Sequence, residues 1–105
     1  MFFAEMKFEE AVYAKVREIP RGRAATYKEV AIAIGKDKAY RAVGNALNRN
    51  PHPKTVPCHR VVRSDLKIGG FSKGIRAKKK LLTEEGVKFD GKRVRPEFLF
   101  RFCHS

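Results

Sequence analysis

The sequence contains no tryptophan, two cysteines and two methionines, and its acidic residues are scarce. Only 11 Asp and Glu oppose 24 Lys and Arg, which gives a formal net charge of +13. A positive charge of this size favours a polyanionic partner, with nucleic acid ahead of an anionic membrane surface. The alternative is a solvated basic surface that only keeps the protein in solution.

Long apolar runs are also missing, so the sequence offers no candidate for a membrane-spanning helix. The first residues, Met1 to Glu5, are too few and too soon acidic for a signal peptide. We therefore expect an intracellular, cytoplasmic protein in which Cys58 and Cys103 stay reduced. Because the histidines do not stand at zinc-ligand spacing to a pair of cysteines, we expect no metal site and no cofactor.

Apolar residues recur at helical spacing in four stretches of a chain whose 105 residues are expected to form one domain. The predicted helices cover about 6–18, 27–34, 38–49 and 74–85. The inward faces of the last two are expected to carry Ala42, Val43, Ala46, Leu47, Ile75, Leu81 and Leu82.

Local signals indicate where the two middle helices begin and end. Thr26 followed by Glu29 has the form of a capping box, in which each residue satisfies a backbone N–H of the first turn. Gly35 is expected to end helix 27–34 in a left-handed conformation, and Asp37 to cap the next helix. These two helices form a helix-turn-helix pattern. In so basic a chain the pattern favours nucleic-acid docking over two ordinary packed helices.

The β structure is expected to be minor. Val61-Val62 predicts a short extended segment, and Asp90-Gly91 predicts a hairpin within 87–94. The apolar tail 96–105 is expected to dock on a body formed by residues 1–95. We therefore predict a mostly α fold with minor β, built as a winged-helix-like helix-turn-helix domain.

One heptapeptide, Val56-Pro57-Cys58-His59-Arg60-Val61-Val62, places a thiol directly beside an imidazole. A thiol is a strong nucleophile only as the thiolate, and a neighbouring base is the usual way to form it. The alternative is an inert buried cysteine next to a core histidine. In a chain of this charge, the pattern predicts a nucleophile that acts on an anionic substrate.

The segment Pro57 to Val62 resembles the active-site signature of the methylated-DNA–protein-cysteine methyltransferases, which repair guanine alkylated at O6. The resemblance covers about residues 8–90. It includes Tyr27 in Thr-Tyr-Lys-Glu-Val-Ala, Arg41-Ala42-Val43-Gly44, Asn50-Pro51, Gly69 to Ser72, Leu81-Leu82 and Glu85-Gly86. The implied fold is the catalytic, DNA-binding domain of that family.

The resemblance also implies a chemical role for each matching residue. Cys58 is the nucleophile and alkyl acceptor, and His59 is its general base through a bridging water. Glu85 holds His59 in the right tautomer, in the manner of hydrolase triads, although Glu84 is a rival for this role. Asn50 braces the turn that carries the cysteine. Tyr27 donates a proton or a hydrogen bond to the guanine ring as negative charge develops there.

For binding, the resemblance implies that a monomer takes double-stranded DNA through the minor groove. The alkylguanine is flipped out of the stack, and a cation on the second helix of the motif fills its place. The implied DNA contacts are Tyr40, Arg41, Ala42, Gly44, Arg60 and Lys78, and Arg41 is the cation that fills the stack. Lys78, Lys79 and Lys80 are expected to form a solvated face. The implied pocket walls are Pro53, Val61, Phe71 and Ser72.

The sequence departs from the family in three respects. We expect the family's N-terminal domain to be absent, which is also a feature of the alkyltransferase-like proteins that bind alkylated DNA without repairing it. Those proteins generally replace the signature cysteine, so Cys58 favours transfer. Tyr40 and Phe71 stand where a smaller residue and a tyrosine are common. Besides alkyl transfer and lesion binding, a helix-turn-helix regulator whose Cys58 senses alkylation or oxidation stays open.

Overall fold

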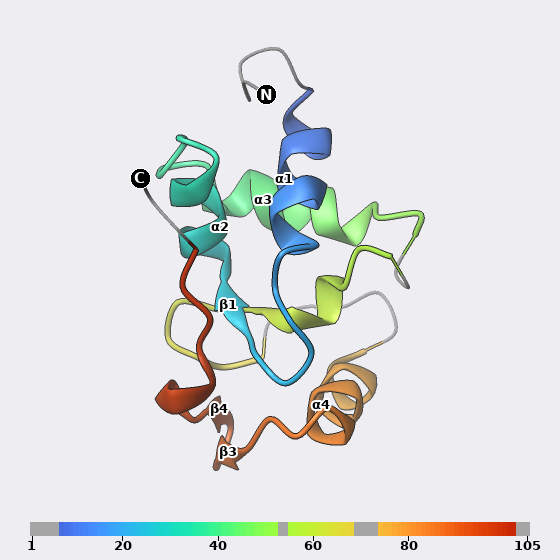
Figure 1. Ribbon diagram of the computed structural model, residues 1–105, viewed down its shortest axis with the longest axis vertical. Helices are drawn as coiled ribbons and strands as arrows, with labels where there is room; N and C mark the ends of the chain where they lie inside the picture. Colours follow the sequence, from blue (N-terminus) through green and yellow to red (C-terminus); the bar gives the residue numbers. More distant parts are fainter. Residues whose placement is uncertain (1–6, 53–54, 69–73, 103–105) are drawn as a thin grey trace.

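The structure is a computed structural model that describes residues 7–52, 55–68 and 74–102 (Figure 1). Its α-helices are α1 (Phe8–Val16), α2 (Tyr27–Ala33), α3 (Tyr40–Asn48) and α4 (Ile75–Glu84). Two short 3-10 helices and four two-residue strands complete it: η2 (Cys58–Arg60), η3 (Pro96–Phe98), β1 (Ala25–Thr26), β2 (Val61–Val62), β3 (Phe89–Asp90) and β4 (Arg93–Val94).

The fold is the predicted one, mostly helical with minor β structure, and α2 and α3 form its helix-turn-helix. In Figure 1, α1, α2 and α3 gather at one end, while α4 and the β3–β4 hairpin lie at the other. Within the described ranges, no helix has both the length and the apolar character that crossing a membrane requires.

The first helix buries Ala11, Val12 and Val16 on one face, as its apolar spacing predicted. It ends at Val16 rather than 18, because the chain tightens into 3-10-type turns in which Ile19 N donates to the Val16 carbonyl at 3.1 Å. Ile19 is nevertheless fully buried, so the apolar pattern extends past the helix end.

Thr26 and Gly35 cap the two ends of α2, as predicted. The Thr26 side chain accepts a hydrogen bond from Glu29 N at 3.0 Å, which satisfies one free donor of the first turn. At the other end Gly35 adopts φ +78°, and Lys36 N donates to the Ala31 carbonyl at 2.9 Å. This is the hydrogen bond that closes a helix whose terminal residue is left-handed.

The prediction for the start of α3 is wrong. Asp37 caps nothing there: the helix begins at Tyr40, and the residue before it, Ala39, makes no side-chain cap. The reason is that Asp37 lies inside the turn after α2, which the Ala39 N to Lys36 carbonyl hydrogen bond closes at 2.9 Å.

The inward face of α3 is partly as predicted. Val43, Ala46 and Leu47 are buried. Ala42 is exposed, which corrects its assignment to that face. A small side chain in a periodic pattern does not reveal on which side of the stripe it lies.

A small parallel sheet connects the helix-turn-helix to the cysteine segment. Ala25 pairs with Val61 and Thr26 with Val62. On the other side of β1, Ala24 forms a parallel bridge with Leu99, and Phe100 N donates to the Ala24 carbonyl at 2.7 Å. β1 was not predicted, because two residues leading directly into a helix show no alternation. The predicted hairpin is confirmed as β3 and β4, but its turn is one residue later than predicted: Asp90 pairs with Arg93, and Gly91, at φ +64°, and Lys92 form the turn.

Two apolar clusters lie on either side of this sheet. The larger joins α1, α2 and α3 and includes Cys58, Val61 and Phe102, and the smaller includes Val62, Leu82 and Val94. Leu82 packs inward as predicted.

The predicted inward packing of Ile75 and Leu81 is wrong, because they are 58% and 36% exposed. The inward stripe of α4 runs instead through Lys78 and Leu82, four residues apart, and Leu81 is turned about 100° away from it.

Replacing Phe102 by Ala should lower the free energy of unfolding by about 3–5 kcal/mol, because it removes a buried ring from the cluster that contains Cys58. Chemical denaturation would measure the loss. Leu81→Ala is the matched control, since Leu81 is partly exposed and its truncation should cost much less. Equal losses in the two variants would contradict the docking of Phe102 in the core.

Candidate active site

Cys58 begins the short helix η2, and its backbone is fixed by tight local turns. Pro57 has φ −76° and ψ +70°, and Cys58 N donates to the Val56 carbonyl at 2.7 Å, which is an inverse γ-turn. The cysteine is a free thiol that is only 7% exposed. The sulfur therefore sits at the edge of the core rather than on an open loop.

Asn50 braces the loop that leads to this turn. Its Nδ2 donates to the Val56 carbonyl at 2.9 Å, and its Oδ1 accepts from His52 N at the same distance. The side chain thereby spans the segment from the end of α3 to the residue before Pro57. This is the geometry that the predicted bracing role of Asn50 requires.

The next residue, His59, points toward the end of α4. Its Nε2 lies 3.0 Å from Oε2 of Glu85, the residue that ends this helix. Glu84, the rival partner, is exposed, and Glu85 is the carboxylate that reaches the ring. An ionised carboxylate only accepts hydrogen bonds, so Nε2 donates and the lone pair of neutral His59 is on Nδ1.

Arg60 lies in a different place from the one predicted. Its Nε donates to Glu85 Oε1 at 2.9 Å and its Nη2 to Oε2 at 2.7 Å, a two-pronged contact. Its Nη1 donates to the carbonyl of Ile19 at 2.8 Å. The side chain is only 16% exposed. The guanidinium therefore points inward to the carboxylate, whereas a DNA contact would point toward solvent.

Burial and hydrogen bonding set the charges of this group. Burial alone would raise the pKa of Glu85, but the hydrogen bonds from Arg60 and His59 outweigh it and lower that pKa to about 2. Burial lowers the pKa of His59, and its hydrogen bond to Glu85 offsets only part of that effect. At neutral pH the group is a carboxylate, a neutral imidazole and a guanidinium.

Lys78 is fully buried, which corrects its predicted place on a solvated face with Lys79 and Lys80. Its Nζ donates to the Tyr27 hydroxyl at 3.3 Å and lies 5.4 Å from the centre of that ring. Burial lowers the pKa of Lys78 to about 8, an effect that the charge of Cys58 in its ionised form partly offsets. A run of three lysines looks solvated, but helical periodicity turns its first member inward.

Tyr27 stands at the other end of this contact. Burial raises the pKa of its hydroxyl to about 12, and the charge of Cys58 in its ionised form adds to the shift. The hydroxyl therefore keeps its proton at neutral pH. Gly44 on α3 faces the ring, and a methyl group added there would make ordinary contact with it, at 3.8 Å. The Tyr27 ring therefore does not require a glycine at position 44.

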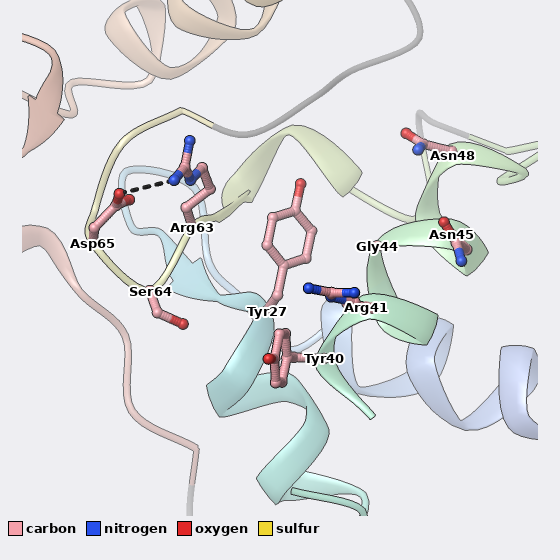
Figure 2. Close-up of a pocket in the computed structure, with 9 residues that line it drawn as sticks. All are labelled: Tyr27, Tyr40, Arg41, Gly44, Asn45, Asn48, Arg63, Ser64 and Asp65. Atoms are coloured by element: carbon pink, nitrogen blue, oxygen red, sulfur yellow. Dashed lines mark ion pairs between the residues drawn. The ribbon is translucent and has the colours of Figure 1, made fainter. Parts of the chain in front are cut away.

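A pocket of about 500 Å³ opens beside Tyr27, between α3 and the segment that follows β2 (Figure 2). Figure 2 shows the Tyr27 ring between Arg41 on α3 and Arg63 on that segment. Three predicted DNA contacts line the pocket: Tyr40, Arg41 and Gly44. The other lining residues were not predicted as site residues: Asn45, Asn48, Arg63, Ser64 and Asp65.

Asn45 and Asn48 could have been found, because they follow Arg41 at helical spacing of four and seven residues. The segment with Arg63 carries no such signal. An ion pair of 3.1 Å joins Arg63 to Asp65 there.

Several predicted site residues are not brought to this pocket. Cys58 is not among its lining residues, and neither is Ala42, although Ala42 is exposed on the same helix. Val61 is fully buried in the cluster that contains Cys58. Pro53, Phe71, Ser72 and Cys103 lie outside the described residues. Among the described part of the chain, no three His, Cys, Asp or Glu side chains gather as metal ligands would.

Residues 7–87 match a protein-family model described as "6-O-methylguanine DNA methyltransferase, DNA binding domain". A methylated-DNA–protein-cysteine methyltransferase of Methanosarcina barkeri is 50% identical over 78 residues, 74% of this chain and 49% of that protein. The protein of the same name from Methanothermobacter thermautotrophicus is 45% identical over 81% of this chain and 47% of its own length. The chain thus spans about half the length of these curated relatives.

Two solved structures extend the comparison. The Mycobacterium tuberculosis OGT in complex with DNA superposes with a TM-score of 0.73 at 40% identity, over 76% of this chain and 50% of that one. The Schizosaccharomyces pombe Atl1 in complex with damaged DNA containing O6-carboxymethylguanine gives 0.75 at 36% identity. That match covers 90% of this chain and 94% of Atl1.

Replacing Lys78 by Met should remove a specific pH dependence of stability. Between the pKa of about 8 in the fold and the ordinary value of about 10.4, the folded chain has lost a proton that the unfolded chain keeps. The free energy of unfolding therefore rises with pH above about 8. In Lys78→Met this rise should vanish, and at pH 7 the variant should be no less stable because no charge is buried.

Urea denaturation from pH 7 to 10 measures this effect. Lys79→Met is the control, because Lys79 is exposed and its loss should leave the rise in place. A rise of undiminished size in Lys78→Met would show that another group produces it.

Proposed function

Because the chain belongs to the 6-O-methylguanine DNA methyltransferase family, we propose that it transfers an alkyl group, most simply methyl, from O6 of guanine in DNA to its own Cys58. The observation that carries this proposal is the hydrogen bond of 3.0 Å between His59, which follows Cys58 directly, and the buried carboxylate of Glu85. That pairing gives a thiol a base whose lone pair is already placed on Nδ1.

The transfer balances as a single displacement. His59 takes the thiol proton through a bridging water, and Glu85 stabilises the imidazolium that forms. The sulfur of Cys58 then forms a bond to the alkyl carbon, the bond from that carbon to O6 breaks, and the electron pair stays on the guanine. The thioether has no good leaving group, so each molecule acts once.

Tyr27 and Lys78 support the departure of the guanine. Negative charge develops on the purine as the bond to O6 breaks, and a hydroxyl that keeps its proton up to a pKa of about 12 can donate a hydrogen bond to it. Lys78 donates to the same oxygen at 3.3 Å and thereby polarises the hydroxyl toward donation. In this proposal Lys78 acts from inside the protein, not on a phosphate.

For binding, we propose that α3 and the pocket beside Tyr27 face double-stranded DNA through its minor groove, with one protein molecule per lesion. The lesion leaves the stack at a cost of roughly a few kcal/mol, and Arg41 fills the vacated space. The net charge of +13 and the exposed Arg41, Tyr40 and Ala42 support this placement. Pro53, Phe71 and Ser72 remain the proposed walls of the alkyl pocket, whereas Val61 is fully buried in the core.

The second candidate is binding of alkylated DNA without transfer. The match to Atl1 supports it, because that structure is a complex with damaged DNA containing O6-carboxymethylguanine, and it superposes on this chain with a TM-score of 0.75. The presence of Cys58 favours transfer. Both candidates place the protein on the cell's DNA, and one experiment separates them.

Incubation with an O6-methylguanine oligonucleotide should add one methyl group per chain, as measured by intact mass, and peptide mapping should locate it on Cys58. Cys58→Ala should gain no methyl group while it still binds the oligonucleotide. The same oligonucleotide with unmodified guanine is the control. Tight binding with no change in mass would select the second candidate, and methylation of Cys103 instead would contradict the assigned nucleophile.

Arg41→Ala should slow transfer from duplex DNA by a larger factor than transfer from free O6-methylguanine, because only the duplex requires extrusion of the base. Arg76→Ala is the matched control, since it removes an exposed arginine from α4 instead of α3. Single-turnover rates on both substrates provide the test. Equal slowing on duplex and free base would remove Arg41 from base extrusion.

A further inference from the structure

Arg60 makes more contacts than a surface cation would. Its three guanidinium nitrogens donate to both oxygens of Glu85, at 2.9 and 2.7 Å, and to the carbonyl of Ile19, at 2.8 Å. Ile19 lies just after α1, and Glu85 is the C-cap residue that directly follows α4. Arg60 therefore links the cysteine turn to two other parts of the fold through one planar group.

We infer that Arg60 is a positioning residue that aims the Glu85 carboxylate at His59 and keeps that imidazole uncharged until Cys58 gives up its proton. The inference deepens the proposed function and rests on it, because it concerns the same proton relay, in which His59, held by Glu85, takes the proton of Cys58. It assigns to Arg60 an internal role in place of the DNA contact expected from the sequence.

Orientation is the first part of the argument. A carboxylate held by one hydrogen bond can rotate, whereas a bidentate contact with a planar guanidinium fixes its plane. Glu85 Oε2 accepts from Arg60 at 2.7 Å and from His59 at 3.0 Å, so the plane that Arg60 fixes is the one that meets the imidazole. The contact from Arg60 to Ile19 in turn prevents the guanidinium from following the carboxylate.

Charge is the second part. Three cations act on the His59–Glu85 pair: Arg60 from η2, Lys78 within α4, and Arg21, whose Nη1 is 4.0 Å from Glu85 Oε2; the Cys58 sulfur, when ionised, acts on Lys78. Arg60 and Lys78 repel a proton on His59 and so help burial to lower its pKa. Arg21 is 69% exposed, so solvent screens it.

The consequence is an imidazole that is a base at neutral pH although a carboxylate is bound to it. Without Arg60, the full negative charge of Glu85 would act on His59 and raise its pKa. A protonated His59 cannot accept the thiol proton, so the acid limb of the pH–rate profile would move to higher pH.

The experiment follows the His59 ring by NMR from pH 4 to 9 in the wild-type chain and in Arg60→Gln, Arg60→Lys and Arg21→Gln. Circular dichroism checks that each variant is folded. In Arg60→Gln the His59 titration should move to higher pH, whereas in Arg21→Gln, which removes a cation at the same carboxylate, it should stay in place. An unmoved titration in Arg60→Gln, or an equal move in both, would overturn the inference.

Arg60→Lys separates orientation from charge and serves also if Arg60→Gln does not fold. Lysine keeps the cation but not the planar fork, so the His59 titration should stay close to that of the wild type. The single-turnover rate of methyl transfer at its pH optimum should fall by roughly ten- to a hundredfold. A full wild-type rate in Arg60→Lys would overturn the orienting role.

The two readouts also separate this inference from the proposed function. The NMR titration needs no DNA and no transfer, so it tests Arg60 even in a chain that only binds lesions. A wild-type chain that fails to gain a methyl group would contradict the proposed transfer, and the titration would still decide whether Arg60 controls His59.

Discussion

The arrangement of the site depends on one buried carboxylate. Glu85 ends α4 and accepts hydrogen bonds from both His59 and Arg60, which come from the cysteine turn. Removing Arg60 would take away the buried cation that compensates the charge of Glu85, at a cost of about 3–5 kcal/mol. The same contact therefore contributes to stability, brings the helix end to the turn, and orients the imidazole next to the proposed nucleophile.

A second constraint comes from a positive charge inside the fold. Lys78 is fully buried beside Tyr27, and its pKa is lowered to about 8. A buried ammonium normally destabilises a fold, so its presence indicates a function that uses it. The proposed function supplies one, because both the thiolate of Cys58 and the departing guanine carry negative charge. The positive charge of the chain thus includes a buried ammonium, Lys78, as well as the cations on the surface.

The sequence predicted those parts of the fold that depend on neighbouring residues. Thr26 and Gly35 cap α2 because capping involves atoms only a few residues away. The prediction that Asp37 caps α3 was wrong because Asp37 lies inside the turn that the Ala39 N to Lys36 carbonyl hydrogen bond closes. The predictions of a solvated Lys78 and a buried Ile75 were wrong because packing against the rest of the core decides which stripe of α4 is covered. The sheet between β1 and β2 joins segments far apart in the chain, and no local pattern encodes that pairing.

The turn Cys58–Arg60 has three residues in a 3-10 helix, so successive side chains leave it about a third of a turn apart. One tripeptide therefore holds a sulfur at the edge of the core and brings both a ring and a guanidinium to Glu85, and the guanidinium also reaches the Ile19 carbonyl after α1. Three adjacent residues thus supply most of the relay, and the carboxylate of Glu85, distant in the sequence, completes it. A designer who wished to move this relay to another scaffold would need a braced tight turn, one helix end within reach of it, and a backbone carbonyl that holds the guanidinium as that of Ile19 does.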